Sequence, residues 1–550
     1  MKDFSILIGG EAGFGIDSSA IIIAKILNQF GFNIYIYREY PSLIRGGHTF
    51  AIIRAAHEKI AAHRDRVDFI LALNQDCIDL DKRFIKDETT IIYDSGTVKT
   101  DGIAINLSEI IKEEKATAIM KNSILIGALC SVLGIDENII KDVFKKHLSK
   151  YWESNLKVAL RGYNSVETIS KIEKASDSKR PILTGNDAIS LGLVHAGLDS
   201  YLAYPMTPTS GILHFLAKIE KQLNLKVIHP ESETSAVMMA LGLSSAGSKV
   251  AIGTSGGGFC LMTEGLSFAA MAELPVVFIL GQRPGPSTGL PTYSTQTELN
   301  FALHSGHGEF LRFITAPGDA EEAYYWSGVS LNIAWKYQIP SILLTDKTLS
   351  EGMYSFDKKV LKDLKEENGP FWDKKGSYKR FLNTENGISP LAFYGEKNAT
   401  IKINSYEHDE YGITIEDSDT TMMMQNKRLG REKFLLKELE NYETVKTYGD
   451  EKSSTAILCW GSNKGVCVEV AKTLGLKVIQ PIVLSPFPQE EFKKATQNIK
   501  NLISVENNAT GQLSNLIKLH GFGVNSRILK YDGRPFIVEE LINKVKKVLK

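Results

Sequence analysis

Short apolar runs alternate with segments of helical periodicity along most of the chain. Residues 4–8 (FSILI) form an apolar run typical of a buried parallel strand. A Gly-rich stretch follows at 9–15, and residues 16–31 then carry apolar side chains at helical spacing. Further strand-like runs lie at 33–40, 68–74 and 90–94. This alternation predicts a doubly wound α/β unit of about 170 residues.

The same rhythm restarts beyond a polar stretch. Residues 173–182 break the periodicity and are typical of a linker. Strand-like runs recur within 183–354, each ending in Gly, Pro, Ser or Thr and usually followed by a helical segment. Ligands of open α/β sheets bind at those carboxyl ends of the strands, so we expect functional residues there. The rhythm fades over 355–445, an expected irregular connecting segment, and returns over 446–550 as a third α/β domain.

Size and composition narrow the class of protein. With 550 residues the chain is too long for one core and is expected to form roughly three or four domains. Lys+Arg and Asp+Glu both total 64, a balance that argues against a nucleic-acid partner. No apolar run approaches the ~20 residues of a membrane span, and the N-terminus lacks the basic region of a signal peptide. We therefore expect no membrane partner and a cytoplasmic location.

The cysteines argue against several kinds of site. All five are scattered, without a C-x-x-C pair, which disfavours a disulfide framework and a structural zinc site. An iron–sulfur cluster typically needs four thiolates in tight groups, so the chain is not expected to hold one alone. The run EHDE at 407–410 is better explained as a solvated acidic turn than as a metal site. No metal is therefore predicted on this chain.

Two Gly-rich turns mark the N-terminal unit. Gly10, Gly13 and Gly15 precede the first helix, where backbone N–H groups can bind an anion. Their spacing differs from the G-x-G-x-x-G fingerprint of dinucleotide binding, and no acidic residue clearly takes the ribose role. A tight turn with close packing and a phosphate-bearing ligand both remain open. The second turn is predicted at Arg45, Gly46 and Gly47.

Three loops of the second unit contain candidate ligand-binding residues at predicted strand ends. The hydroxyls of AYPMTPTS at 203–210 either cap the next helix or help its N-terminus to bind a carboxylate or phosphate. The glycines of TSGGGF at 254–259 either form a tight turn or let another molecule approach the backbone. Arg283, within GQRPGPSTGLPT, is either a surface arginine or a residue whose planar guanidinium group binds a carboxylate.

The segment IHPESETSAVMMALG at 228–242 opens with two glutamates before an apolar helix. Ser232 is a plausible N-cap, so the helix is expected to begin near Glu233. Glu233 then heads the apolar stripe of the helix, whereas Glu231 precedes the cap. Both could simply favour the positive helix end, which is worth about 0.3–1 kcal/mol. A partly buried carboxylate would instead have a raised pKa and could share a proton with a ligand nitrogen.

In this order the motifs resemble the α subunit of 2-oxoacid:ferredoxin oxidoreductases, in the form with a γ domain fused at the N-terminus. The resemblance covers nearly the whole chain. GGEAGFG and PSLIRGGH are similar to the γ domain, and EHDEYGITIED to the linker of the family. GNDAISLG, YPMTPTS, ESETSA, TSGGGF, QRPGPSTGLPT, HSGHGEF and APGD are similar to the thiamine-pyrimidine domain. The implied fold is a three-domain α/β chain with a Rossmann-like γ domain at 1–172, a doubly wound thiamine diphosphate-binding domain at 183–354 and a transketolase-C-like domain at 446–550.

The resemblance also implies roles for single residues. Glu233 would form a hydrogen bond with the aminopyrimidine ring of thiamine diphosphate. Ala236, Ala240 and Gly242 follow it at the spacing of the family pattern, whereas the residues after Glu231 do not match that pattern. Thr207 and Arg283 would hold the carboxylate and keto group of the substrate. Further cofactor contacts are implied at Tyr204, Pro205, Thr254, Ser255 and Gly256, and the γ-domain loops with Gly10, Gly13, Gly15, Arg45, Gly46 and Gly47 are candidates for coenzyme A.

What the chain lacks implies a partner. No Gly-Asp-Gly…Asn segment for Mg²⁺ and diphosphate is apparent, and neither are cluster-binding cysteines. In the family these lie on a separate β subunit, and in some members also on a small ferredoxin-like subunit. The resemblance thus implies half an enzyme, which shares thiamine diphosphate with its β subunit and uses coenzyme A and ferredoxin as co-substrates.

Two other functions compete with this interpretation. A non-catalytic thiamine-fold protein for assembly or binding would not need Glu233, Thr207 and Arg283. The hypothesis of a nicotinamide-dependent dehydrogenase is supported only by one glycine loop that matches the dinucleotide fingerprint imperfectly. Within the family, the γ–α fusion and PSTGLPT favour 2-oxoglutarate or general 2-oxoacids, with pyruvate, branched-chain and aryl 2-oxoacids as alternatives.

Overall fold

The computed structural model describes residues 1–42, 46–148 and 151–550. The chain forms two compact units. Unit 1 comprises Met1–Leu183, Glu351–Asp357 and Phe536–Lys550, and unit 2 comprises Thr184–Ser350 and Lys358–Pro535. The finer five-part division expected from the sequence stays a prediction.

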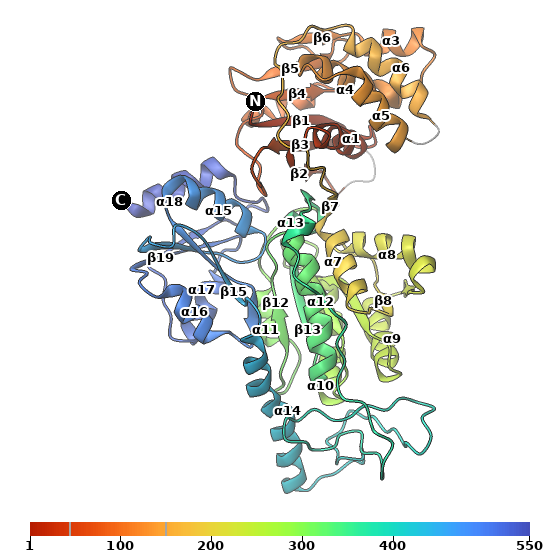
Figure 1. The fold of residues 1–550 in the computed structure, drawn as a ribbon, viewed down its shortest axis with the longest axis vertical. Helices are drawn as coiled ribbons and strands as arrows, with labels where there is room; N and C mark the ends of the chain where they lie inside the picture. The colour runs from red at the N-terminus through yellow and green to blue at the C-terminus, as the bar shows by residue number, and fades with distance from the viewer. Residues whose placement is uncertain (43–45, 149–150) are drawn as a thin grey trace. The chain divides into compact units, whose positions relative to one another are not determined.

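Unit 1 is built on a mixed sheet with helices packed against it (Figure 1). Within the described residues its strand order is β6 (Ile103–Ile105), β5 (Thr90–Asp94), β4 (Phe69–Ala72), β1 (Asp3–Glu11), β3 (His48–Ala56), β2 (Asn33–Glu39), β14 (Met353–Ser355) and β7 (Ile182–Thr184). The helices are α1 (Ile16–Asn28), α2 (Asp76–Asp79), α3 (Leu107–Glu113), α4 (Lys121–Val132), α5 (Glu137–His147), α6 (Trp152–Tyr163) and α18 (Val538–Leu549). The apolar faces of α1, α4 and α5 form one continuous core with β1, β2 and β3.

Two of the described strands of unit 1, β3 and β14, run against the expectation of a parallel sheet. β1 is parallel to β4, as predicted for FSILI, but it is antiparallel to β3. β3 is the next strand after β2 along the chain and pairs with it antiparallel as well. A chain that reverses without a crossover helix can pair only antiparallel, so β3 enters the sheet between β1 and β2 in the opposite direction.

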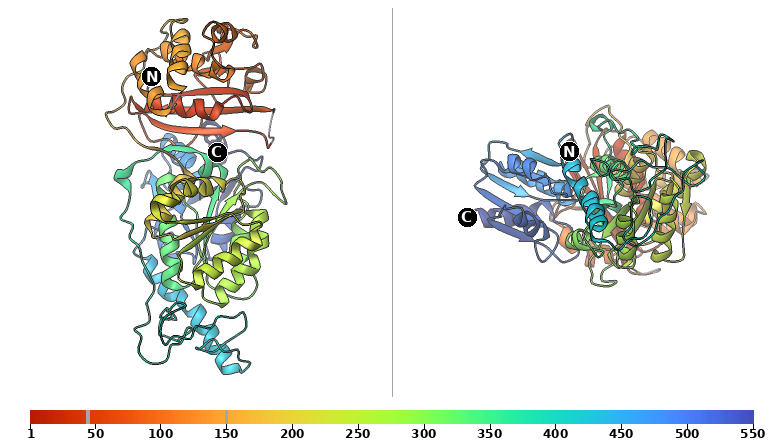
Figure 2. Two further views of the ribbon diagram at one scale, coloured as in Figure 1. Left: turned by 90° about the vertical axis from the view of Figure 1, so that its right-hand side faces the viewer. Right: turned by 90° about the horizontal axis from the view of Figure 1, so that it is seen from below.

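Unit 2 contains an almost wholly parallel sheet between layers of helices (Figure 2). Its strand order is β18 (Val483–Ser485), β12 (Phe313–Thr315), β13 (Ser341–Asp346), β11 (Val277–Gln282), β10 (Val250–Ser255), β8 (Ser200–Leu202) and β9 (Lys226–Ile228), with β18 alone antiparallel among the described strands. Its helices are α7 (Gly185–His195), α8 (Ser210–Leu223), α9 (Glu233–Ser245), α10 (Gly256–Met271), α11 (Leu299–His304), α12 (Ala320–Tyr337) and α13 (Lys347–Glu351). The central strands are buried on both faces, which explains their near-continuous apolar sequences.

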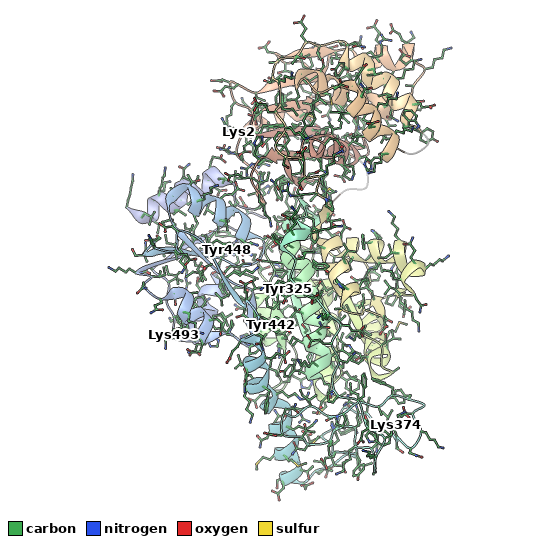
Figure 3. All side chains as sticks on the ribbon, viewed as in Figure 1. Lys2, Tyr325, Lys374, Tyr442, Tyr448 and Lys493 are labelled. Atoms are coloured by element: carbon green, nitrogen blue, oxygen red, sulfur yellow. The ribbon has the colours of Figure 1, made fainter. Side chains whose placement is uncertain are left out.

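The C-terminal part of unit 2 is a smaller α/β layer. Its sheet order is β15 (Val445–Gly449), β17 (Lys477–Pro481), β16 (Thr455–Leu458), β19 (Asn501–Glu506) and β20 (Ser526–Leu529). Its helices are α15 (Asn463–Leu474), α16 (Gln489–Thr496) and α17 (Gln512–Leu519). β18 joins this region to the larger sheet, and Lys464 at the start of α15 pairs with Asp319 at 2.6 Å and Glu322 at 2.7 Å. Tyr448, labelled in Figure 3, also donates its hydroxyl to Glu322.

The segment between the two sheets of unit 2 ends in a long helix. From η4 (Lys358–Val360) onward the described chain is irregular, and Figure 3 marks Lys374 within this stretch. α14 (Ser418–Leu439) then runs for 22 residues, which differs from the expected irregular segment. The buried positions of α14 include Lys427, Arg428 and Arg431, so charged residues interrupt the apolar stripe that would have revealed the helix.

These buried cations surround one carboxylate, Glu273, which follows α10. Lys427 contacts both carboxylate oxygens at 2.6 and 2.7 Å, and Arg431 donates to one of them. Arg380 of the irregular segment donates to the backbone carbonyl of Glu273 at 2.8 Å. Although burial alone would raise it, the cations hold the pKa of Glu273 far below its usual range, so the carboxylate stays charged. The cluster ties α14 and the irregular segment to α10.

No helix of the described residues is both long and apolar enough to cross a bilayer.

We predict that Glu273→Gln lowers the free energy of unfolding by about 3–5 kcal/mol, because it leaves the buried cations without their counter-charge. Denaturant unfolding followed by circular dichroism measures the change. Glu396→Gln is the matched control, since Glu396 pairs with Lys374 at the surface and its loss should change stability by less than about 1 kcal/mol. Equal effects of the two substitutions would contradict the structural role of Glu273.

Candidate active site

The topology of the parallel sheet brings three predicted loops to one edge. β8 lies between β9 and β10, so the chain leaves β8 on one side and returns on the other. At such a switch point the loops beyond the carboxyl ends of neighbouring strands diverge and leave a crevice. The loop 203–209 follows β8, Glu233 follows β9, and the Gly-rich turn follows β10.

Glu233 is the first residue of α9, and the predicted helix start is confirmed. Ser232 is the N-cap, and its hydroxyl accepts from the backbone N–H of Ser235 at 3.2 Å. Glu233 is 6% exposed, whereas Glu231 is exposed and lies before the cap. No hydrogen bond or ion pair of the described residues reaches the carboxylate of Glu233. A buried carboxylate is costly without a partner, so this one fits a ligand that donates a hydrogen bond.

The Gly-rich turn packs directly against Glu233. A Cβ on Gly258 would lie 2.9 Å from Oε1 of Glu233 and 2.1 Å from the hydroxyl oxygen of Thr254. Only glycine therefore fits at 258 without a shift, while a Cβ on Gly257 would meet nothing within 4 Å. Ser255 is the N-cap of α10, yet its buried hydroxyl finds no hydrogen-bond partner in the described chain. The turn offers bare backbone and an unused hydroxyl to a ligand.

Arg283 and Thr207 are brought together from two different strand ends. Arg283 follows the last residue of β11 and donates to the backbone carbonyl of Thr207 at 3.2 Å. Burial lowers the pKa of Arg283, but arginine stays charged at any physiological pH. Asn186 on α7 supports this loop by donating to the carbonyl of Pro208 at 2.8 Å. A guanidinium held at this loop suits a planar carboxylate.

The remaining residues of this loop have simpler surroundings. Tyr204 is 39% exposed, and its ring lies edge-on to that of His229 at 6.2 Å. Pro205 is half-buried beside it. Thr209 takes the N-cap position of α8 but does not cap it, because its hydroxyl donates to the carbonyls of Met206 and Thr254. The hydroxyl thus joins the β8 and β10 loops.

Three polar residues near the crevice were not singled out from the sequence. Asn186 lies within GNDAISLG and holds Pro208 in place. Thr292 closes PSTGLPT with a buried hydroxyl that has no partner in the described residues. Glu298 lies against Gly256, whose Cβ would come within 2.9 Å of its carboxylate. The other site residues were located because they are polar and directly follow an apolar strand. Glu298 does not directly follow a strand, so this signal could not locate it.

The Gly-rich turns of unit 1 lie next to each other. The backbone N–H of Ala12 donates to the carbonyl of Gly47 at 3.1 Å, which joins the turn with Gly10 to the second turn. Gly13 and Gly46 have positive φ angles, and a Cβ on either would meet nothing within 4 Å. Gly15 is the left-handed N-cap of α1. Arg45 lies outside the described residues.

Beside Gly15 the unit contains a cavity of about 170 Å³. Its polar lining comes from the hydroxyls of Ser18, Ser19 and Ser123 and from the amides of Asn122 and Asn155. The positive φ angles of Gly13 and Gly46 explain glycine at both positions, and Gly10 and Gly15 are closely packed, as a tight turn requires. The open space at Gly13 and Gly46 also leaves room for an anion near the N-terminus of α1, so the phosphate-bearing ligand stays a prediction.

The acidic run EHDE differs from the solvated turn expected from the sequence. His408 is fully buried and lies 3.9 Å from the ring of Phe381, centroid to centroid. Glu407 forms a bidentate ion pair with Arg428, and Glu410 pairs with Lys379 at 2.6 Å. The run is a structural anchor for α14. Over the described ranges, no cluster of three His, Cys, Asp or Glu side chains is arranged to hold a metal ion.

The crevice fits the aminopyrimidine half of thiamine diphosphate. A protonated ring nitrogen would supply the missing partner of Glu233, and the glycines at 256–258 leave the turn bare for a flat ring. Fold and crevice thus suit a protein that binds the aminopyrimidine half of thiamine diphosphate.

Comparison with known proteins identifies the family. Residues 192–427 match the thiamine diphosphate-binding region of pyruvate flavodoxin/ferredoxin oxidoreductases, and residues 5–165 match the pyruvate ferredoxin/flavodoxin oxidoreductase family. The 2-oxoacid:ferredoxin oxidoreductase α subunit of a Sulfolobus species is 32% identical over 99% of this chain and 97% of its own. The α subunit of 2-oxoacid:ferredoxin oxidoreductase 1 from Sulfurisphaera tokodaii is 32% identical over 99% and 98%.

A solved structure agrees over the whole length. The 2-oxoglutarate:ferredoxin oxidoreductase of Magnetococcus marinus, with 2-oxoglutarate, coenzyme A and succinyl-CoA bound, superposes with a TM-score of 0.91 at 30% identity. The match covers 100% of both chains. The chain belongs to the 2-oxoacid:ferredoxin oxidoreductase family, and the resemblance and fold class inferred from the sequence are confirmed.

We predict that Gly258→Ala weakens thiamine diphosphate binding, because the new methyl group displaces Glu233 and Thr254. Overpacking of this kind costs about 1–3 kcal/mol, or roughly five- to 150-fold in affinity. Calorimetric titration of the assembled enzyme measures it. Gly430→Ala on α14 is the matched control and should bind as the wild type does, since its methyl group would meet nothing within 4 Å and lies outside the Gly-rich turn. Unchanged binding by both variants would contradict this placement of the cofactor.

Proposed function

We propose that the chain is the γ–α fused subunit of an enzyme that oxidatively decarboxylates a 2-oxoacid, with 2-oxoglutarate favoured, to acyl-CoA and CO₂ while reducing ferredoxin. The observation that carries the proposal is Glu233, a buried carboxylate without a partner in the described chain, at the switch point of a parallel sheet. A non-catalytic assembly protein would have no use for such a costly group.

Glu233 works through a ring nitrogen of the cofactor. When bound, thiamine diphosphate would supply the carbon nucleophile and the electron sink that decarboxylation of a 2-oxoacid needs. Glu233 accepts a hydrogen bond from the ring nitrogen and so holds a proton there. The N-terminus of α9 stabilises the charge of Glu233, and the packing of Gly258 fixes its direction.

Arg283 and Thr207 recognise the 2-oxoacid. The guanidinium of Arg283 binds the carboxylate, and the hydroxyl of Thr207 donates to an oxygen of the substrate. The hydrogen bond from Arg283 to the Thr207 backbone holds the two residues close to each other. Tyr204, Pro205, Thr254, Ser255 and Gly256 complete the wall around the cofactor.

The other half of the site belongs to a β subunit. The relatives of this chain are named α subunits, which implies a β subunit in their complexes. In our proposal that subunit carries the Mg²⁺, the diphosphate site and the iron–sulfur cluster, and ferredoxin or a small ferredoxin-like subunit takes the electrons. The five cysteines of this chain are free thiols, in keeping with a reducing cytoplasm.

Coenzyme A is assigned to unit 1. The loops with Gly10, Gly13, Gly15, Gly46 and Gly47 present open backbone beside the N-terminus of α1, where phosphate oxygens bind well. Arg45 belongs to the same turn in sequence and would add a charge. The bound coenzyme A and 2-oxoglutarate of the Magnetococcus marinus enzyme support both the co-substrate and the favoured substrate.

The partner requirement is tested by reconstitution. We expect the chain with its β subunit, thiamine diphosphate, Mg²⁺ and coenzyme A to reduce ferredoxin with 2-oxoglutarate. A panel of pyruvate, branched-chain and aryl 2-oxoacids decides the specificity. Ferredoxin reduction by the chain alone would disprove the half-enzyme proposal, and inactivity of the complete complex with every 2-oxoacid would disprove the function.

The role of Glu233 is tested by Glu233→Gln, which keeps the shape but loses the charge. We predict that kcat falls by about 10²-fold or more, as for loss of a general acid–base group. Glu231→Gln, two residues earlier and outside the helix, should retain wild-type turnover. Full activity of Glu233→Gln at saturating thiamine diphosphate would reject the assignment.

A further inference from the structure

The five-stranded sheet in the C-terminal part of unit 2 has a switch point of its own. Its strand β16 lies between β17 and β19 and runs parallel to both. The chain leaves β16 through α15 to β17 on one side, and it reaches β19 on the other side only later. By the rule that located the first crevice, the space beyond the carboxyl ends of β16 and β19 is a place for a ligand. The proposed function assigns nothing to this place.

A side chain of the same chain, Gln296, fills this second switch point. Gln296 is 1% exposed, and its amide nitrogen donates to the carbonyl of Trp460 at 2.7 Å. Its amide oxygen accepts from the side-chain amide of Asn463 at 2.8 Å and from the backbone N–H of Asn507 at 3.0 Å. Trp460 and Asn463 follow β16, and Asn507 follows β19. Gln296 therefore bonds to both strand ends, as a ligand at a switch point would.

The backbone on either side of this glutamine is held as well. The N–H of Gln296 donates to the carbonyl of Asn507 at 2.8 Å, and the carbonyl of Gln296 accepts from the side-chain amide of Asn508 at 3.1 Å. The hydroxyl of Thr295 donates to the carbonyl of Asn507 at 2.8 Å. Buried amides are costly when they lose a partner, so these bonds hold residues 294–298, the anchor segment, firmly on the five-stranded sheet.

The far end of the anchor segment reaches the candidate active site. The backbone N–H of Glu298 donates to the side-chain oxygen of Gln282 at 3.1 Å, and Gln282 directly precedes Arg283. The side chain of Glu298 also lies against the Gly-rich turn, because a Cβ on Gly256 would come within 2.9 Å of its carboxylate. The position of Gln296 is thus passed on, two residues later, to the strand end that carries Arg283.

The loop between Arg283 and the anchor segment depends on these two ends. Residues 285–290 of this loop are exposed, so few packing contacts of their own hold them. A loop of this kind takes its position from the residues on which it begins and ends. Arg283 forms one end, beside the Thr207 loop, and the anchor segment forms the other.

We propose that Gln296 is a positioning residue for the 2-oxoacid. By filling the switch point of the five-stranded sheet it fixes the anchor segment, and through Gln282 it holds the guanidinium of Arg283 where the substrate carboxylate binds. The inference rests on the proposed function for the identity of the substrate. Because Gln296 is buried among the strand ends, it does not contact the substrate, and its loss should weaken substrate binding without slowing the chemical step.

The kinetics of Gln296→Leu test this inference, because leucine has a similar volume but no amide. In the assembled enzyme we expect KM for the 2-oxoacid to rise by about ten-fold or more, while kcat changes by less than about three-fold. Gln480→Leu is the matched control. Gln480 is also a fully buried amide of the five-stranded sheet, but it donates to Glu322 of α12 at 2.9 Å. An unchanged KM in Gln296→Leu, or an equal rise in Gln480→Leu, would overturn the proposal.

Hydrogen exchange of the chain alone, followed by mass spectrometry, does not depend on turnover. Gln296→Leu should speed exchange within residues 284–298, and Gln480→Leu should not. If Gln296→Leu does not fold, Asn463→Ala replaces it and should give a smaller change in the same residues, because it removes one hydrogen bond to Gln296. Wild-type exchange over 284–298 in the folded variant would overturn the proposal, even in an active enzyme. Faster exchange in a chain whose complex turns over no 2-oxoacid would support the anchoring by Gln296 and place the error in the proposed function.

Discussion

The helix α10 is held at one end by a buried charge cluster and carries half of the candidate site at the other. Glu273, just beyond its last turn, is surrounded by Lys427 and two arginines that come from segments more than a hundred residues later in the chain. A buried carboxylate that lost these partners would be too costly to keep, so the cluster and the fold depend on each other. Its position fixes the axis of α10 and thereby the place of the Gly-rich turn at the N-terminus.

The parallel sheet adds the second constraint. Because all but one of the described strands in the seven-stranded sheet of unit 2 run the same way, the loops after β8, β9, β10 and β11 meet at one edge. Residues as far apart in the sequence as Thr207 and Arg283 become neighbours without any long-range signal in the chain. The close contact of Gly258 with Glu233 then limits the directions in which this carboxylate can find a partner.

Local features could be predicted from the sequence, and partners could not. The cap at Ser232 and the start of α9 at Glu233 depend on a few adjacent residues, and the structure confirms them. The family motifs also located the loops of the crevice. By contrast, α14 escapes prediction because its buried face contains Lys427 and Arg431, whose burial makes sense only once Glu273 is known to face them. The burial of His408 escapes prediction for a similar reason, since Phe381, which covers it, belongs to a distant part of the irregular segment.

The two carboxyl groups of the crevice differ in their surroundings. Glu233 heads a helix, whose N-terminus favours its charge, and lacks a partner in the described chain, so it is ready to accept a hydrogen bond from a ligand. Burial raises the pKa of Glu298, which faces the same turn from another element. The cluster around Glu273 is satisfied within the chain, whereas this crevice is not, so the fold can stand without the ligand but the site is complete only with it.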